Sequence, residues 1–311
     1  MEQQQNNWVS SYIFLDTNLD TLLVELIDPM QKELTRKKWI ISYFFIRYWE
    51  GGSHIRFRVK VSDSTPTKTI EQYIRKKTEA YFIAIQNSNY RLEFNQYFPE
   101  TSRYGGVKTI TLAEKHFKKS SDIVLSTLKQ HQENWGYSTA MATAIQLHII
   151  AIKELTHGNI NETVAFFETV CNNWLSHSVK KINDAIDPKE VKKVLQFFNT
   201  SYQNQKDKID SLCQVLWAEN HEELVGWSNF SKHTAKGLIE SYESEAIEIP
   251  LWMNFDNIQN ISKKNKVLWN LYDSLIHMTN NRLGIYLRDE SFIAFLIMKG
   301  LQAHSQNKIV I

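Results

Sequence analysis

Apolar and basic residues alternate along residues 54–61. Because side chains alternate between the two faces of a β-strand, this spacing predicts a strand with one apolar face and one basic face. A guanidinium group is a planar donor that stays charged at physiological pH, so such a row can receive carboxylate or phosphate groups. The pattern also fits the solvated outer face of a half-buried sheet. The apolar positions are Ile55, Phe57, Val59 and Val61, and the basic positions are His54, Arg56, Arg58 and Lys60.

The first third of the chain combines strand and helix patterns. β-Branched and aromatic runs predict strands over 8–16, 39–49, 54–61 and 89–97, and helical spacing predicts helices over 20–33 and 67–86. We expect Pro29 to kink or break the first helix, and Gly51 with Gly52 to form a hairpin turn. The order β-α-β-β-α-β predicts a ferredoxin-like sheet with helices on one face.

From residue 109 onward the pattern is almost entirely helical. Segments 180–188 and 249–262 are expected to be surface connections. The sequence therefore predicts an α+β protein, with an α/β sheet subdomain over 1–108 and a helical subdomain over 109–311 that pack as one functional unit. Apolar residues at three- and four-residue spacing predict helices over 109–130, 138–155, 162–177, 188–220, 222–245, 263–281 and 289–303.

Composition and charge narrow the classes of function. A net charge of +2 over 311 residues is too small to indicate a nucleic-acid partner, so anion recognition must rest on local clusters. The sequence has no dinucleotide-binding, Walker, zinc-protease or serine-hydrolase motif. Cys171 and Cys213 have no metal-ligand spacing, and we expect them to be reduced, buried and cytoplasmic. No export signal is expected at the N-terminus, and the apolar runs are too short to span a membrane.

A second candidate segment is residues 97–106, which ends Arg103-Tyr104-Gly105-Gly106. Two adjacent glycines predict a sharply turned backbone that holds Arg103 over the sheet. The alternative is an ordinary turn in which Arg103 pairs with Glu100 or with solvent.

A third candidate is His277 in the predicted helix over 263–281. It projects away from the apolar face, with Asp273 one turn before it and Asn281 one turn after it. Asp273 is therefore the carboxylate expected to orient the imidazole ring, as a base-and-orienter pair requires. The alternative is an ordinary surface histidine.

These segments resemble the C-terminal elimination domain of LanB-type lantibiotic dehydratases, a family that includes stand-alone thiopeptide-type bacteriocin biosynthesis proteins. One departure is that Ser120-Ser121 stands where the family pattern has Asp-Ser. The matching residues run in family order over nearly the whole chain: Trp8, Phe44-Phe45-Ile46-Arg47-Tyr48, His54-Ile55-Arg56-Phe57-Arg58, Tyr97, Pro99-Glu100, Arg103-Tyr104-Gly105-Gly106, Ala113-Glu114, Phe117, His277-Met278 and Asn281-Arg282.

The resemblance implies a lyase that removes glutamate from glutamylated Ser or Thr of a ribosomal precursor peptide, leaving dehydroalanine or dehydrobutyrine. The catalytic residues that it implies correspond to Arg58, Arg103 and His277. No metal or organic cofactor is expected. The residues expected to bind substrate are Arg47, Arg56, Tyr104 and Arg282.

The chemistry of these side chains fits that reaction. Elimination of an acyl-linked glutamate needs a base for the Cα proton, positive charge near the developing enolate, and recognition of the glutamate carboxylates. We expect Arg58 and Arg103 to bind the glutamyl group and the developing charge. His277 is expected to transfer a proton, either as a base at Cα or as an acid toward the leaving group.

Two other functions fit the same sequence. Stand-alone members of the family include synthases that join two dehydroalanines by formal 4+2 cycloaddition, and a non-catalytic subunit could hold a precursor peptide at the sheet edge and basic face. Retention of the Arg-Arg-His set favours elimination, because cycloaddition has no glutamate to expel. The expected partners are a precursor peptide, a separate glutamyl-tRNA-dependent glutamylating dehydratase and a cyclase, without direct nucleic-acid contact, in the cytoplasm.

Overall fold

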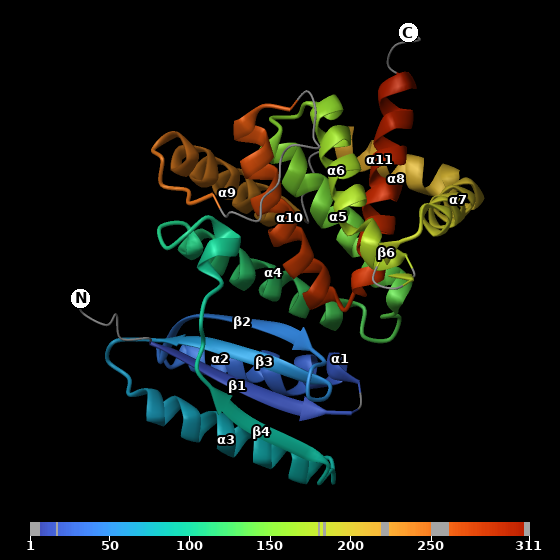
Figure 1. Cartoon of the computed structure of the whole chain (residues 1–311). Coiled ribbons are helices and arrows are strands. Elements are labelled where there is room, and N and C mark those ends of the chain that lie inside the picture. Colours follow the sequence, from blue (N-terminus) through green and yellow to red (C-terminus); the bar gives the residue numbers. More distant parts are fainter. Residues whose placement is uncertain are drawn as a thin grey trace. The chain divides into compact units, whose positions relative to one another are not determined.

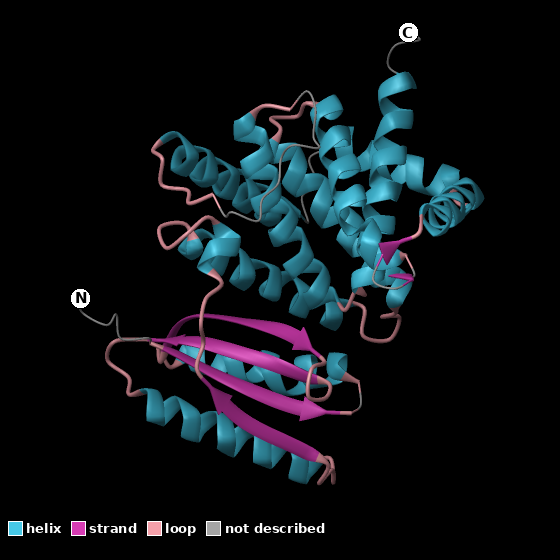
Figure 2. Cartoon of the chain, viewed as in Figure 1, coloured by secondary structure: helices cyan, strands magenta, loops and turns pink. Residues whose placement is uncertain are grey.

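The computed structural model describes residues 7–16, 18–179, 181–182, 185–218, 224–249 and 261–307 (Figure 1). It confirms a mixed α/β protein, with one four-stranded antiparallel sheet near the N-terminus and helices through most of the remaining chain (Figure 2). The backbone divides into two compact units. Unit 1 comprises Met1–Glu100 and Ala113–Trp135, and unit 2 comprises Thr101–Leu112 and Gly136–Ile311. The units therefore differ from a simple division at residues 108 and 109.

The sheet of unit 1 has the strand order β2-β3-β1-β4, and every neighbouring pair is antiparallel. The expected alternation along β3 is confirmed, because Ile55, Phe57 and Val59 are all fully buried. Gly51 and Gly52 form the hairpin turn between β2 and β3 with φ of +77° and +115°, a region that favours glycine. The strands are β1 (Trp8–Leu15), β2 (Ile40–Tyr48), β3 (His54–Val61) and β4 (Tyr90–Asn95).

The helix before β2 continues further than Pro29 suggested. A short helix α1 (Leu19–Leu22) leads into a π-helical turn (Leu23–Ile27) and then into α2 (Asp28–Arg36). Pro29 lies in the first turn of α2, where the missing N–H does not interrupt the α-helical hydrogen bonds. Of the kink or break expected at Pro29, the break is excluded, and an irregular π-helical turn lies directly before this residue.

Helix α3 (Thr67–Ala84) and most of α4 (Ile110–Gln130) complete unit 1. Three side chains of α4 contact earlier parts of this unit. Ser121 Oγ accepts a hydrogen bond from the Phe45 amide at 3.3 Å, Asp122 accepts one from the Tyr43 hydroxyl at 2.5 Å, and Lys129 pairs with Asp28 at 2.7 Å. These contacts join residues 76 to 101 positions apart, which explains why α4 belongs with the sheet although it follows the expected boundary.

Unit 2 is built from helices in which α11 packs along α6 and α8, and α10 packs along α5 and α9. In the described part of the chain, no helix is long and apolar enough to cross a membrane. Cys171 and Cys213 are free and buried, as expected, and burial raises the pKa of each thiol to about 12. The helices are α5 (Tyr137–Leu155), α6 (Ile160–Ser178), α7 (Pro188–Asn204), α8 (Lys206–Ala218), α9 (Val225–Glu243), α10 (Lys263–Leu283) and α11 (Glu290–Asn307).

Two expectations for this half of the chain are corrected. The single helix expected over 188–220 is two helices, because the backbone leaves the helical conformation at Gln205, with φ of −130° and ψ of 20°. The connection expected over 180–188 contains a small antiparallel pair of strands, β5 (Lys181–Ile182) and β6 (Ala185–Ile186). Most of the expected connection over 249–262 lies outside the described residues.

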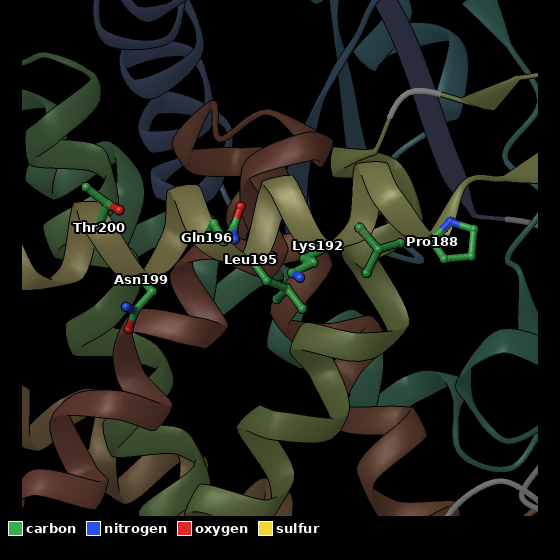
Figure 3. Close-up of a pocket in the computed structure, with 7 residues that line it drawn as sticks. Pro188, Lys192, Leu195, Gln196, Asn199 and Thr200 are labelled. Atoms are coloured by element: carbon green, nitrogen blue, oxygen red, sulfur yellow. The ribbon is translucent and has the colours of Figure 1, made fainter.

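An open depression runs along one side of α7 (Figure 3). Pro188, Lys192, Leu195 and Asn199 are among its seven lining residues, all of which belong to this one helix. None of the residues expected to bind substrate or to act in catalysis lines it. The depression is therefore separate from the candidate functional residues.

We predict that Asp28→Asn lowers the free energy of unfolding by about 1 to 3 kcal/mol. The Asp28 side chain is 3% exposed. Although burial acts to raise its pKa, hydrogen bonds from Lys129, Lys32 and Gln31 lower it overall. Urea denaturation measures the change, with the exposed Glu79→Gln on α3 as a control expected to stay within about 0.5 kcal/mol of wild type. Equal unfolding midpoints for both variants would exclude Asp28 as an anchor for α4.

Candidate functional site

Arg58 lies on the central strand β3 of unit 1, opposite Ser10 on β1 and Phe44 on β2. Its guanidinium carbon is 4.5 Å from the centre of the Tyr97 ring and 5.5 Å from that of Phe44, and its Nε donates to Ser10 Oγ at 3.4 Å. Cation–π contacts with aromatic faces hold a guanidinium group without neutralising its charge. Burial lowers the pKa of Arg58, an effect that marks a charge removed from water.

Arg56 is held in the same way one position along this face of β3. Its guanidinium carbon lies 3.4 Å from the Tyr48 ring centre and 4.6 Å from that of Tyr12. Its Nε donates to His54 Nε2 at 3.2 Å, and His54 Nδ1 lies 2.7 Å from the Gly52 carbonyl oxygen, so Nδ1 carries the hydrogen. His54 is 1% exposed, and burial lowers its pKa. His54 is therefore a buried support for Arg56 and not a member of a solvated row.

Neither Arg56 nor Arg58 has a carboxylate within ion-pair distance among the described residues. Two carboxylates lie on this face: Glu93 of β4 pairs with Arg91, and Glu114 of α4 accepts a hydrogen bond from the Tyr97 hydroxyl at 3.3 Å. Burial raises the pKa of Glu114, while Lys60 and Tyr97 act to lower it. In the described part of unit 1, two guanidinium groups thus lie on the sheet without an ion pair to a carboxylate.

Arg103 lies in unit 2, in a 3₁₀ segment (Thr101–Tyr104) before two glycines. Gly105 and Gly106 have φ of +81° and +98°, which confirms the sharp turn. A Cβ atom on Gly106 would meet the side chain of the exposed Glu248, which can move, so the positive φ is the main constraint at this position. The turn brings Arg103 Nε to 3.5 Å from Ser274 Oγ on α10.

His277 lies on α10 one turn after Ser274, and elements of unit 2 hold its ring on two sides. Its Nδ1 is 2.8 Å from Oε1 of Glu290, the first residue of α11. The Trp174 ring on α6 stacks against the imidazole, with centroids 4.8 Å apart and planes at 16°. The His277 side chain is 16% exposed and that of Glu290 is 2% exposed. The arrangement is a carboxylate–imidazole pair with a fixed ring plane.

Asp273 does not orient His277, contrary to the expectation from helical spacing. Its Oδ1 accepts from Trp174 Nε1 at 2.6 Å and its Oδ2 accepts from Asn173 Nδ2 at 3.2 Å, so both oxygens have partners on α6. Burial raises the pKa of Asp273 to about 6, although its two hydrogen bonds act to lower it. Asp273 therefore supports the tryptophan that stacks on His277.

Three residues expected to bind substrate have other surroundings. Arg47 pairs with Asp20 at 2.5 Å, so a carboxylate already balances its charge. Tyr104 is 5% exposed, and Arg282 is fully buried and donates from Nη1 to the Met278 carbonyl at 2.6 Å. For these residues the structure favours structural roles over direct contact with a substrate.

Within unit 2, Arg103 contacts Ser274 of α10, which is one helical turn before His277. Arg58 and Arg56 belong to unit 1, and their convergence with Arg103 and His277 stays a prediction. Sequence reasoning missed Glu290 and Trp174. They are 13 residues after and 103 residues before His277, so no helical spacing connects them with it.

The sequence matches a family model described as "Lantibiotic biosynthesis dehydratase C-term" over residues 8–300. The chain belongs to this family. The two arginines of unit 1, and Arg103 and His277 of unit 2, can therefore be compared with proteins of this family.

Two of the similar proteins are much longer than this lantibiotic dehydratase C-terminal chain. It is 22% identical over 301 residues to nisin biosynthesis protein NisB of Lactococcus lactis subsp. lactis, covering 94% of this chain and 25% of NisB. The tRNA-dependent lantibiotic dehydratase MibB of Microbispora sp. 107891 shares the fold, with a TM-score of 0.61 and 18% identity over 99% of this chain and 29% of MibB. The chain thus spans about a quarter of NisB and under a third of MibB.

The fold of this family member is also similar to that of TbtD, a pyridine synthase from thiomuracin biosynthesis. The TM-score is 0.68 and the identity 12%, over 96% of this chain and 98% of TbtD. The family fold therefore occurs in a dehydratase and in a pyridine synthase, and the side chains must decide between such functions.

We predict that Asp273→Asn changes the pH dependence of stability. Because the folded-state pKa of about 6 lies above the ordinary value of 3.8, wild type loses stability as the pH rises through this interval. At about 1.4 kcal/mol for each pKa unit, the loss amounts to about 3 kcal/mol, and D273N lacks it. Urea denaturation at about pH 3.5 and pH 7 should show that D273N becomes more stable relative to wild type as the pH rises. Asp207→Asn, at an exposed position of α8, is the control and should follow wild type; a D273N difference that is constant with pH would contradict the prediction.

Proposed function

We propose that this protein is the elimination component of a split lanthipeptide or thiopeptide dehydratase. It would remove glutamate from glutamylated Ser or Thr of a ribosomal precursor peptide to give dehydroalanine or dehydrobutyrine. The observation that carries the proposal is Arg58, a partly buried cation held by aromatic rings with no carboxylate partner among the described residues. The carboxylates of a glutamyl group supply the anion that this site lacks.

The proposed roles follow from the chemistry of each group. Arg58 and Arg103 bind the glutamyl carboxylates and stabilise the negative charge that develops on the enolate. Arg56 assists Arg58 from the neighbouring position on the same strand face. His277 transfers the proton, since its ring is oriented by a buried carboxylate and partly exposed. No step in this proposal uses a metal or an organic cofactor.

Membership of the lantibiotic dehydratase C-terminal family supports the proposal. NisB and MibB are named for nisin biosynthesis and for tRNA-dependent lantibiotic dehydration, and the chain corresponds to about a quarter to a third of each. We propose that a separate glutamyl-tRNA-dependent enzyme glutamylates the precursor peptide, and that a cyclase acts on the product, all in the cytoplasm. We also propose the ferredoxin-like class for the sheet, which the antiparallel order β2-β3-β1-β4 supports.

Cycloaddition is the second candidate, because TbtD has the same fold over its whole length. Two dehydroalanines, however, carry no carboxylate for Arg58 to bind. A non-catalytic peptide-binding role is the third candidate, but it gives no reason for a carboxylate-oriented histidine. Both observations favour elimination.

We predict that a precursor peptide bearing glutamylated serine loses glutamic acid when incubated with this protein, as measured by mass spectrometry. His277→Ala should abolish the loss while leaving peptide binding intact. The control is His233→Ala, at an exposed position of α9. An unchanged peptide mass with wild type would refute elimination. A ring product from a peptide with two dehydroalanines would instead identify cycloaddition.

We predict that Arg58→Lys lowers the elimination rate by about 10²-fold, since lysine keeps the charge but loses the planar fork that binds carboxylates. The matched control is Arg91→Lys, an exposed arginine of the same sheet that pairs with Glu93 at 2.8 Å. The measurement is the rate at which each variant releases glutamate from a glutamylated peptide. Equal losses of activity in both variants would exclude a specific role for Arg58.

A further inference from the structure

We infer that Glu290 is the positioning residue of His277 and that it makes Nε2 the proton-accepting atom of the elimination, an inference that rests on the proposed function. The Glu290 side chain is almost completely buried, and its Oε1 lies 2.8 Å from His277 Nδ1. An ionised carboxylate can only accept hydrogen bonds, so Nδ1 must carry the hydrogen. The lone pair of the neutral ring is then on Nε2.

Two features of Glu290 bear on its contact with His277. It is the first residue of an 18-residue helix, where the helix dipole favours negative charge. Its second oxygen, Oε2, is buried without a hydrogen-bond partner among the described residues, so the contact with His277 is the one hydrogen bond found there for this carboxylate. A buried acid with so few partners is unfavourable for stability, which points to a role in holding the imidazole.

The other groups around His277 leave Nε2 available. Trp174 stacks on the ring face, and Asp273 has both oxygens bonded to side chains of α6. His177 lies beyond Trp174, with ring centroids 5.2 Å apart. Among the described residues no group hydrogen-bonds His277 Nε2, and the side chain is partly exposed. Arg103 Nε lies 3.5 Å from Ser274 Oγ, one turn earlier on the same helix.

The proposed step moves one proton and breaks one carbon–oxygen bond. His277 Nε2 takes the Cα proton of the glutamylated residue, and the electron pair of the Cα–H bond first forms the enolate of the neighbouring carbonyl and then the Cα=Cβ bond. The Cβ–O bond breaks with its electrons on the glutamyl oxygen, so glutamate leaves as a carboxylate. The imidazolium then releases its proton to solvent, which regenerates the neutral ring with hydrogen on Nδ1. Glu290 acts through His277 and does not touch the substrate.

The tautomer can be measured on the free protein by ¹⁵N NMR of histidine-labelled samples, with the His277 signals assigned by their loss in His277→Gln. At a pH high enough to deprotonate the imidazolium, wild type should carry the remaining ring hydrogen on Nδ1. In Glu290→Gln, whose amide can donate to Nδ1, the population should shift toward hydrogen on Nε2. Hydrogen on Nε2 in wild type overturns the inference, whether or not elimination is observed.

The base role has a separate test on an uncleavable substrate. The probe is a precursor peptide in which 2,3-diaminopropionate, acylated with glutamate through an amide, replaces the glutamylated serine. In deuterium oxide, wild type should exchange the Cα proton, His277→Ala should not, and Glu290→Gln should be slower by about 10² to 10⁴-fold with similar peptide affinity. Absence of exchange with wild type overturns the base assignment.

Two control variants distinguish a role of Glu290 in positioning His277 from an effect on folding. Glu190→Gln removes a carboxylate from the first turn of α7, where it pairs with Lys193, and should match wild type in both experiments. Glu290→Asp retains the charge with a shorter side chain and should recover part of the exchange rate if the protein is folded by circular dichroism. Exchange in Glu290→Gln equal to wild type overturns the positioning role. If wild type releases no glutamate but has hydrogen on Nδ1, the proposed function fails and the tautomer assignment remains.

Discussion

Helix α10 buries polar side chains, and each of them needs a hydrogen-bond partner within unit 2. A buried polar group without a partner costs roughly 1 to 3 kcal/mol, so these contacts constrain the neighbouring helices strongly. Asp273 is bonded to two side chains of α6, His277 to Glu290 of α11, and Asn280 to His148 of α5 at 2.7 Å. Burial lowers the pKa of His148 to about 4, which keeps that ring neutral. The helices around α10 are thus joined by hydrogen bonds as well as by apolar contacts.

The candidate chemistry depends on this constraint. His277 belongs to the same set of partnered groups, but one edge of its ring has no hydrogen bond among the described residues. Trp174 links two of the contacts, because its indole N–H is bonded to Asp273 while its face stacks on His277. A ring fixed in this way loses little freedom when a substrate binds, which is the arrangement that efficient proton transfer requires.

In unit 1, aromatic rings hold two arginine side chains without neutralising their charge. Arg56 and Arg58 lie against the rings of Tyr48, Tyr12 and Tyr97, while Arg47, on the neighbouring strand, is paired with Asp20. The contrast separates arginines that have an anion from those that do not. An anionic substrate group is the simplest partner for the second kind, whereas the paired arginine is explained by the fold alone.

Much of the local structure could be predicted because its signals are local. The alternation along β3, the glycines of the hairpin, and the glycines after Arg103 each act within a few residues, and the structure agrees with all three. The break at Gln205 was missed because neither glycine nor proline marks it, and the turn is instead accompanied by a hydrogen bond from Tyr202 to Asp210. The assignment of α4 to unit 1 was missed because Asp28 and Lys129 are 101 residues apart.

The sequence by itself determined the strands and most helices, because their periodicity is a local pattern. It also singled out Arg58, Arg103 and His277 as candidates, because each lies in a short family motif. Only the tertiary structure decided which carboxylate orients His277. Helical spacing selected Asp273, which is one turn away, but its oxygens are bonded to α6, and Glu290 reaches the ring from α11. The physical reason is that a hydrogen bond depends on distance and direction in space, and packing of three helices sets both.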